Sequence, residues 1–266
     1  MRIPFTKAHG AKNDFLLTWR KDAPGEGLPE LARCLCDRHT GVGADGWMLV
    51  EPAGDPQADG GIQLYNSDGS TAEISGNGTR CAAAFLIQHG HTGEEVRVRT
   101  GAGIKSLRLL GRSGLAFDFE MNMGPAEMRA ERFELALAGG PRDVTLVWVG
   151  NPQCAAPVAD FHFDWRAVGA EIASHRHFPD GTNVSFWRVV DAHTIEARFW
   201  ERGAGETMSS GTGSTGAGAA AVARGAATSP VRVLTPAGPI DLRLEKDIYL
   251  KGPAEIVAEG EFFTRK

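Results

Sequence analysis

Residues 95–109 read EVRVRTGAGIKSLRL and align without a gap to residues 230–244, which read PVRVLTPAGPIDLRL. Nine of these fifteen positions are identical, more than two unrelated segments of this composition would share. The same offset of 135 residues places the segment SGNG at 75–78 on the segment SGTG at 210–213. Self-similarity at a fixed offset is typical of an internal repeat. The sequence therefore predicts one structural unit that occurs twice.

Each repeat closes on a similar motif, GPAE at 124–127 in the first repeat and GPAE at 252–255 in the second. The stretch 129–142 follows the first motif and contains two glycines and a proline, which are typical of a boundary between domains. We therefore expect an N-terminal domain over residues 1–130 and a C-terminal domain over residues 140–266.

Short runs rich in β-branched and aromatic residues dominate both halves, so strands are expected to outnumber helices. The clearest strands are 47–51, 61–65, 96–100, 106–110, 115–120, 145–149, 184–190, 194–200 and 231–235. Two helices are predicted over residues 76–90 and 211–225, each beginning after a serine and ending at a glycine. Because these helices are apolar or tiny on nearly every face, they must be surrounded. We expect an α+β fold of two pseudo-symmetric domains, each a curled β-sheet around a central helix, with the ligand site in the cleft between them.

The composition excludes several classes of protein. With 28 Lys+Arg against 33 Asp+Glu, the net charge is −5, so no basic field exists to attract nucleic acid or anionic lipid. No signal peptide or membrane span is recognisable, so we expect a cytoplasmic protein. Two glycine-rich matches, at 41–46 and 211–216, lack the context of a dinucleotide site. The cysteines have neither disulfide nor zinc spacing, and no metal is expected; they are Cys34, Cys36, Cys81 and Cys154.

The starts of the two predicted helices are candidate anion sites. Ser75 and Ser210 each precede a glycine-containing backbone whose unpaired N–H groups and helix dipole attract negative charge. An ordinary serine N-cap explains one such start as well, but a duplicated pair suggests that both starts face one carboxylate. Glu201 and Arg202 precede the second start, and they suit an ammonium group and a carboxylate respectively. The implied ligand is a zwitterion.

Seven short segments resemble those of the diaminopimelate epimerase family, in the same order and over nearly the whole chain. They are HGAKNDF (9–15), GVGADG (41–46), YNSDGS (65–70), SGNGTRC (75–81), GNP (150–152), GTNV (181–184) and ERGAGET (201–207). The resemblance implies an amino-acid epimerase or racemase that needs no pyridoxal phosphate or other cofactor. The family reaction interconverts LL- and meso-diaminopimelate on the route to lysine and peptidoglycan. The expected partner is a small amino acid, and formation of a homodimer stays open.

The same resemblance assigns a role to each candidate site residue. The reacting carboxylate would be held by backbone N–H groups of Gly76, Asn77, Gly211 and Thr212. The distal carboxylate would be held by Asn66, Asn151, Asn183 and Arg202, and the distal ammonium by Glu201 and Arg202. Asn13 would line the same cleft. Ser75 and Ser210 would stand at the positions of the two catalytic bases.

Those two positions are cysteines in the family and serines here. A helix dipole worth about 2 kcal/mol lowers a pKa by only about 1.5, which makes a thiol of pKa about 8.5 a useful thiolate. An alkyl hydroxyl, for which water of pKa about 15.7 is the guide, stays neutral at pH 7 and needs a neighbouring base. The family often has a histidine after the second Asn-Pro, where this chain has Gln153. The sequence therefore shows no proton acceptor for either serine.

Three explanations of Ser75 and Ser210 stay open. The serines were introduced to trap a substrate, or they belong to an enzyme of other chemistry such as a lyase or dehydratase, or they belong to a binding protein that has lost catalysis. Gln153, and Lys12 where the family usually has glycine, favour natural divergence, because a trapping substitution would change only the thiols. The leading expectation is an isomerase of diaminopimelate epimerase type whose turnover is limited by the serines.

Overall fold

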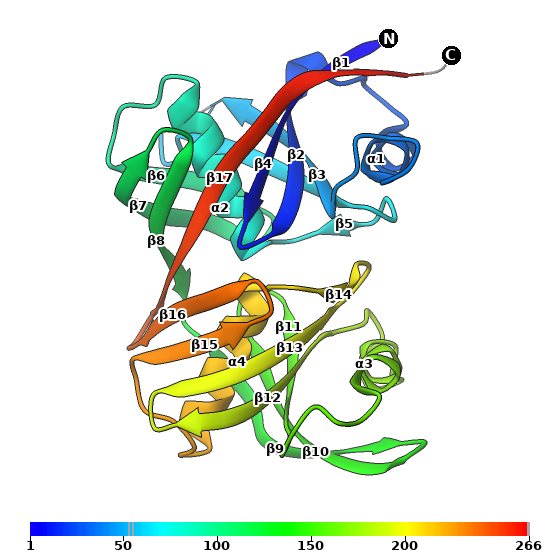
Figure 1. Ribbon diagram of the computed structural model, residues 1–266, viewed down its shortest axis with the longest axis vertical. Coiled ribbons are helices and arrows are strands. Elements are labelled where there is room, and N and C mark those ends of the chain that lie inside the picture. Colours follow the sequence, from blue (N-terminus) through cyan, green and yellow to red (C-terminus); the bar gives the residue numbers. More distant parts are fainter. Residues whose placement is uncertain (53, 55, 265–266) are drawn as a thin grey trace. The chain divides into compact units, whose positions relative to one another are not determined.

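The computed structural model describes residues 1–52, 54 and 56–264 and shows a mixed, sheet-rich fold of α-helices and β-strands (Figure 1). Its contacts divide the chain into two compact units. Unit 1 comprises Met1–Met121 and Gly252–Lys266, and unit 2 comprises Asn122–Lys251. No helix in the described part of the chain has the length and apolar character needed to cross a membrane.

Unit 1 is a ring of strands around one helix. In chain order its elements are β1 (Arg2–Gly10), β2 (Asn13–Trp19), the 3-10 helix η1 (Arg20–Asp22), α1 (Leu28–Cys36), β3 (Gly46–Pro52), β4 (Gly60–Asn66), β5 (Thr71–Ala72), α2 (Gly76–Gln88), β6 (Glu95–Thr100), β7 (Gly103–Ser113), β8 (Ala116–Gly124) and the end of β17 (Ile248–Phe263). The strands pair in the circular order β17, β1, β2, β3, β4, β6, β7, β8 and back to β17. Helix α2 contacts five of these strands and lies inside the ring.

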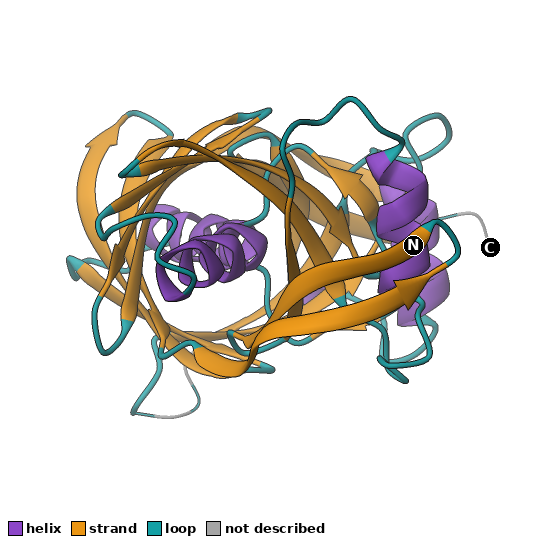
Figure 2. Ribbon diagram, turned by 90° about the horizontal axis from the view of Figure 1, so that it is seen from below, coloured by secondary structure: helices purple, strands orange, loops and turns teal. Residues whose placement is uncertain are grey.

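Unit 2 repeats this plan. Its elements are β9 (Glu127–Leu137), β10 (Gly140–Trp148), β11 (Pro152–Pro157), α3 (Trp165–Ala173), β12 (Asn183–Asp191), β13 (Thr194–Glu201), β14 (Gly205–Thr207), α4 (Gly211–Ala223), β15 (Val231–Thr235), β16 (Gly238–Leu244) and the start of β17. The parallel pairs β2·β3 and β4·β6 of unit 1 correspond to β11·β12 and β13·β15 here. Figure 2 shows strands curling around a helix that lies within them. The predicted wrapping of a central helix by a sheet is therefore present in each unit.

The two central helices have the predicted positions. Each has 13 residues, and each is capped by its preceding serine. The backbone N–H of Gly78 donates to Ser75 Oγ over 3.1 Å, and that of Gly213 donates to Ser210 Oγ over 3.0 Å. The small residues of α4 allow close packing, because a Cβ added at Gly218 would lie 2.6 Å from Leu242 Cδ1. Both helix predictions are confirmed, and so are the nine predicted strands, which all fall in strands apart from Leu115 and Val149, each at one end of its predicted strand.

The repeated segment forms the same hairpin twice. Thr100 Oγ1 donates to the carbonyl of Gly103 over 2.8 Å between β6 and β7, and Thr235 Oγ1 donates to the carbonyl of Gly238 over 2.6 Å between β15 and β16. The two glycines have φ of 88° and 128°, a region that favours glycine. The identical Thr and Gly of the two segments are therefore explained by the turn that they build.

The predicted domain ranges differ from the observed units. Residues 129–142, expected to form a boundary, belong to the hairpin β9–β10, in which Leu137 pairs with Gly140. The chain instead crosses between units near the two GPAE motifs, and β17 continues through the second motif to pair with β1. The last residues therefore return to unit 1, away from the 140–266 range predicted for the second domain. That the two units are a pair of equivalent domains of one family stays a prediction.

The turn between β1 and β2 contains two residues in an unfavourable backbone conformation. Ala11 has φ of 50° and Lys12 has φ of 63°, in the left-handed region where a side chain costs about 1–2 kcal/mol. Lys12→Gly is therefore expected to raise the free energy of unfolding by about 0.5–1 kcal/mol, after the larger entropy of glycine in the unfolded chain is deducted. Urea denaturation measures this change. Lys21→Gly in η1, where φ is not positive, is the control and should lower the free energy of unfolding. An equal decrease in Lys12→Gly and Lys21→Gly would show that the backbone at Lys12 is not strained.

Candidate functional site

The start of α2 is the first candidate half-site, and the β1–β2 hairpin packs against it. A Cβ added at Gly10 would lie 3.1 Å from the Cα of Asn77. The side-chain amide of Asn77 donates to Asn13 Oδ1 over 3.1 Å, and Asn13 Nδ2 in turn donates to Asp45 Oδ2 over 2.7 Å. On its other side Asn77 Oδ1 accepts from Arg80 Nη2 over 2.5 Å. The structure therefore brings together three predicted residues, Asn13, Gly76 and Asn77.

Asp45 and Arg80 are site residues that the sequence did not single out. Both lie inside segments that carry the family resemblance, GVGADG and SGNGTRC, but the resemblance assigned no role to either residue. One signal was available: Arg80 is the single charged residue of a helix that is otherwise apolar or small. A charge in such a helix must find its partners inside the fold.

Asn66 lies at the end of β4, and the hydrogen bond of its side chain is local. Its Nδ2 donates to Ser70 Oγ over 3.0 Å, within the turn that follows the strand. No hydrogen bond joins it to Asn13 or Asn77. The contacts of Asn66 in unit 1 therefore do not test its expected role in holding a distal carboxylate.

The start of α4 in unit 2 is built in the same way. Asn151 Nδ2 lies 3.4 Å from Thr212 Oγ1, and Gln153 Nε2 donates to Asn151 Oδ1 over 2.7 Å. In the parallel pairs, Phe15 stands opposite Gly46 as Gln153 stands opposite Asn183, so Asn13 and Asn151 occupy equivalent positions. Each therefore contacts the second residue of a central helix.

The ERGAGET turn lies at the same end of unit 2. The backbone N–H of Arg202 donates to Asn183 Oδ1 over 3.0 Å, and Asn183 Nδ2 donates to the carbonyl of Pro152 over 3.1 Å. Thr207 Oγ1 donates to Glu201 Oε1 over 3.1 Å. The predicted residues Asn183, Arg202 and Asn151 thus belong to loops joined by hydrogen bonds.

Neither candidate base has an activating partner within its own unit. Among the described residues, no imidazole, carboxylate or amine forms a hydrogen bond with the hydroxyl of Ser75 or Ser210, and both hydroxyls accept from backbone N–H groups, those of Gly78 and Gly213. Gln153 Oε1 is buried and has no described hydrogen-bond partner, but an amide cannot take up a proton at neutral pH. The chemistry of a serine base is therefore unsupported at both helix starts.

No thiol of the chain replaces the missing pair. All four cysteines are free, and only Cys34 is exposed. Burial raises the pKa of Cys36, Cys81 and Cys154 to about 12 each, so these thiols stay protonated at neutral pH. Within the described ranges, no group of three or more His, Cys, Asp or Glu side chains is arranged to hold a metal ion.

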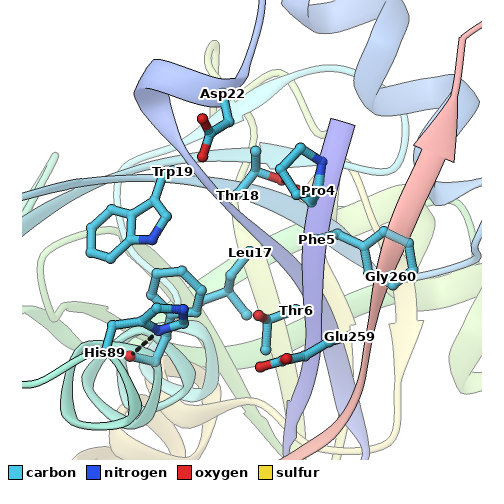
Figure 3. A pocket seen from close by; sticks show the side chains of 11 residues that line it. Pro4, Phe5, Thr6, Leu17, Thr18, Trp19, Asp22, His89, Glu259 and Gly260 are labelled. Atoms are coloured by element: carbon cyan, nitrogen blue, oxygen red, sulfur yellow. Dashed lines mark hydrogen bonds between the residues drawn. The ribbon is translucent and has the colours of Figure 1, made fainter. Parts of the chain in front are cut away.

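Two recesses in the units lie away from the predicted residues. The one in Figure 3 has a volume of about 210 Å³ and lies in unit 1 between the indole of Trp19, the imidazole of His89 and the carboxylate of Glu259. His89 is fixed there by a contact of 2.8 Å between its Nδ1 and the carbonyl of Phe85. The second, of about 500 Å³, lies in unit 2 beside β15 and β16. Neither recess is lined by a predicted site residue, so the candidate site rests on the helix starts.

Comparison with known proteins gives one family. The sequence model described as "Diaminopimelate epimerase" matches residues 5–129 and 145–257. Similar curated proteins carry the same name: that of Pelotomaculum thermopropionicum is 40% identical over 97% of this chain and 98% of its own length. That of an Azoarcus species is 38% identical over 98% of this chain and 99% of its own length.

Solved structures share the fold at low identity. A hydroxyproline epimerase from Agrobacterium vitis, with bound trans-4-hydroxy-L-proline, is similar with a TM-score of 0.76 and 16% identity, covering 98% of this chain and 90% of that one. A phenazine biosynthesis protein of the PhzF family from Bacillus anthracis has a TM-score of 0.71 and 13% identity, covering 99% and 100%. These likenesses concern the arrangement of the chain.

Proposed function

Because the chain belongs to the diaminopimelate epimerase family, we propose that it binds a bis-amino acid of the diaminopimelate type and exchanges its α-proton far more slowly than a thiol enzyme would. One observation carries the second half of this proposal. The hydroxyls of Ser75 and Ser210 cap their helices, and no base forms a hydrogen bond with them in the part of the chain that the structure describes. Binding does not require a thiol, whereas removal of an α-proton does require a base.

In this proposal, both helix starts serve the reacting end of the ligand. The backbone N–H groups of Gly76, Asn77, Gly211 and Thr212 hold the α-carboxylate, since free N–H groups at a helix start suit an anion. The hydroxyls of Ser75 and Ser210 serve as the two groups that exchange the α-proton. The hydrogen bonds between Asn13 and Asn77 and between Asn151 and Thr212 support the role of these starts, because they fix the second residue of each helix.

The distal end of the ligand is assigned to the polar loops. Arg202 holds the distal carboxylate together with Asn66, Asn151 and Asn183, and Glu201 holds the distal ammonium. The bond from the Arg202 backbone to Asn183, and the bond from Arg202 Nη1 to the carbonyl of Asp180 over 2.9 Å, support a fixed guanidinium. A guanidinium that is already ordered loses less entropy on binding a carboxylate.

The reaction step is limited by its base. Epimerisation removes the α-proton from one face of the substrate and returns a proton on the other face. A neutral hydroxyl can return a proton but is a very weak acceptor of one, because its pKa is close to the value of about 15.7 for water. The electron pair left on the α-carbon therefore forms rarely, and exchange is slow.

Two measurements on the unmodified protein test this proposal. Isothermal titration calorimetry with LL-, meso- and DD-diaminopimelate should show binding, with lysine, which lacks the distal carboxylate, as the weaker control. Proton NMR in deuterated water should show slow loss of the α-proton signal of the bound isomer. Absence of binding to every isomer would refute the substrate class. Release of ammonia or water from the ligand would indicate a lyase and contradict the proposed reaction.

A further inference from the structure

Arg80 is a buried cation that the proposed reaction does not use. It lies in the first turns of α2 and has no exposed surface. Its three hydrogen bonds all go to neutral oxygens: Nε to the carbonyl of Pro253 over 3.0 Å, Nη1 to that of Gly76 over 3.3 Å, and Nη2 to Asn77 Oδ1 over 2.5 Å. The guanidinium also packs on β17, because a Cβ at Gly252 would lie 2.9 Å from its Cζ. Its position is therefore strongly constrained.

No carboxylate pairs with this guanidinium among the described residues. The hydrogen-bonded chain that begins at Arg80 reaches an acid only at Asp45, after passing through the amides of Asn77 and Asn13. A buried charge without a direct counter-ion is rare in proteins because of its desolvation cost. Burial lowers the pKa of Arg80 to about 10, so the group keeps its charge at neutral pH. A full positive charge therefore stands beside the peptide groups of Gly76 and Asn77.

We infer that Arg80 is a positioning residue that supplies most of the positive potential at the start of α2, and that Asp45, Asn13 and Asn77 hold it there. The inference rests on the proposed function, since it names what makes this helix start an anion site. A desolvated charge acts over several ångströms with little screening by water, whereas a helix dipole supplies only about half a charge. The guanidinium thus favours negative charge on a ligand carboxylate or on a base at position 75.

The two helix starts then differ in strength. At the offset of 135 residues, Thr215 in α4 takes the place of Arg80, and its hydroxyl donates to the carbonyl of Gly211 over 2.8 Å. No cation stands at that position in unit 2. The start of α2 is therefore the stronger anion site, and a base at position 75 ionises more easily than a base at position 210.

A thiol placed at position 75 reports this potential without any substrate. In a Cys34→Ser background, which removes the single exposed thiol, Ser75→Cys introduces one titratable reporter beside three buried thiols. Its pKa is read from thiolate absorbance at 240 nm and from the pH dependence of iodoacetamide labelling. Adding Arg80→Gln, which keeps hydrogen bonds but removes the charge, should raise that pKa by about 1. Adding Arg80→Lys, which keeps the charge, should change it much less.

The matched control is the same measurement in unit 2. The pKa of the thiol introduced by Ser210→Cys should rise less than that of the thiol at position 75 when Arg80→Gln is added. Other charged side chains on strands around α2, such as Lys7, Asp14 and Lys105, are identical in every variant and cancel in the comparison. An unchanged pKa of the thiol at position 75 in Arg80→Gln would overturn the inference, because the charge would then have no effect there. Equal rises of this pKa in Arg80→Gln and Arg80→Lys would also overturn it, because they would indicate an effect of lost hydrogen bonds alone.

Asp45→Asn keeps the test decisive if Arg80→Gln fails to fold. This substitution removes the carboxylate at the far end of the hydrogen-bonded chain, while Arg80 keeps its own bonds to the carbonyls of Pro253 and Gly76, so the pKa of the thiol at position 75 should fall; a rise would contradict the inference. The outcome is independent of the proposed function. If the thiol responds to Arg80 as expected while calorimetry finds no diaminopimelate binding, the substrate class is wrong and the role of Arg80 stands.

Discussion

Exchange of the α-proton of diaminopimelate with deuterated water is expected to accelerate by about 10²–10⁴-fold when Ser75→Cys and Ser210→Cys are combined. A thiol of pKa about 8.5 is brought near neutrality by a helix start, whereas the serine hydroxyl stays protonated. The substitution should leave the backbone of both helix starts unchanged. A cysteine sulfur can accept from the N–H groups of Gly78 and Gly213, which donate to the serine Oγ atoms in the unmodified protein. Proton NMR of the α-signal measures the rate, and chiral chromatography measures conversion between isomers.

The two single substitutions and Gln153→His separate the contributions. Each single thiol should give less exchange than the pair, since one face of the α-carbon then lacks an efficient base. Gln153→His in the double variant tests whether the missing imidazole beside Asn151 limits the rescue. Rapid exchange by the unmodified serine protein would show that the pKa argument is wrong. A double variant that binds diaminopimelate without exchange would refute the assigned geometry of the two bases.

The affinity for diaminopimelate is expected to fall by at least about 30-fold in Arg202→Ala. Removing one member of a buried charge pair costs about 2–5 kcal/mol, and each 1.4 kcal/mol is a factor of ten in the dissociation constant. The guanidinium of Arg202 donates to the carbonyl of Asp180, and the aliphatic part of its side chain packs on Gly181, where a Cβ would lie 3.0 Å from Arg202 Cδ. Isothermal titration calorimetry measures the loss directly.

Arg198→Ala is the matched control for this variant. Arg198 lies on β13, the strand that ends just before Arg202, but its guanidinium pairs with Glu196 rather than with a predicted site residue. Its removal should leave the affinity unchanged. Lysine should bind Arg202→Ala and the unmodified protein equally, because it lacks the distal carboxylate. An equal loss of affinity for lysine and diaminopimelate would show that Arg202 does not bind the distal carboxylate.

The repeat is the part of the fold that sequence reasoning recovered best. Identical residues 135 positions apart predicted α2 and α4 with their serine caps, and the structure adds that the matching Thr and Gly build equal hairpins. These features are local, since a cap or a turn is decided by a few neighbouring residues. The 129–142 boundary was wrong because glycine and proline suit a hairpin turn as well as a linker.

The hydrogen bonds that link the residues of each half-site could not be predicted from the sequence. Asn13 and Asn77 were predicted as separate site residues, but their shared hydrogen bond, and its extension to Asp45 and Arg80, joins positions far apart in the chain. The direction of a side-chain amide is set by such partners and leaves no trace in a motif. The serines are the opposite case, because their identity alone shows that no thiolate can form at positions 75 and 210.

The path of β17 means that unit 2 can complete its fold before unit 1 during synthesis. β1 is synthesised well before β17, its partner strand, in which Phe263 pairs with Arg2. Unit 2 is a continuous segment that ends at Lys251, so most of its partners have emerged before the last residues of unit 1. Until then one edge of β1 stays open, and an open edge is a site for pairing with other chains. Unit 1 therefore closes only after unit 2 has been synthesised, which exposes the nascent chain to misassembly until β17 is released.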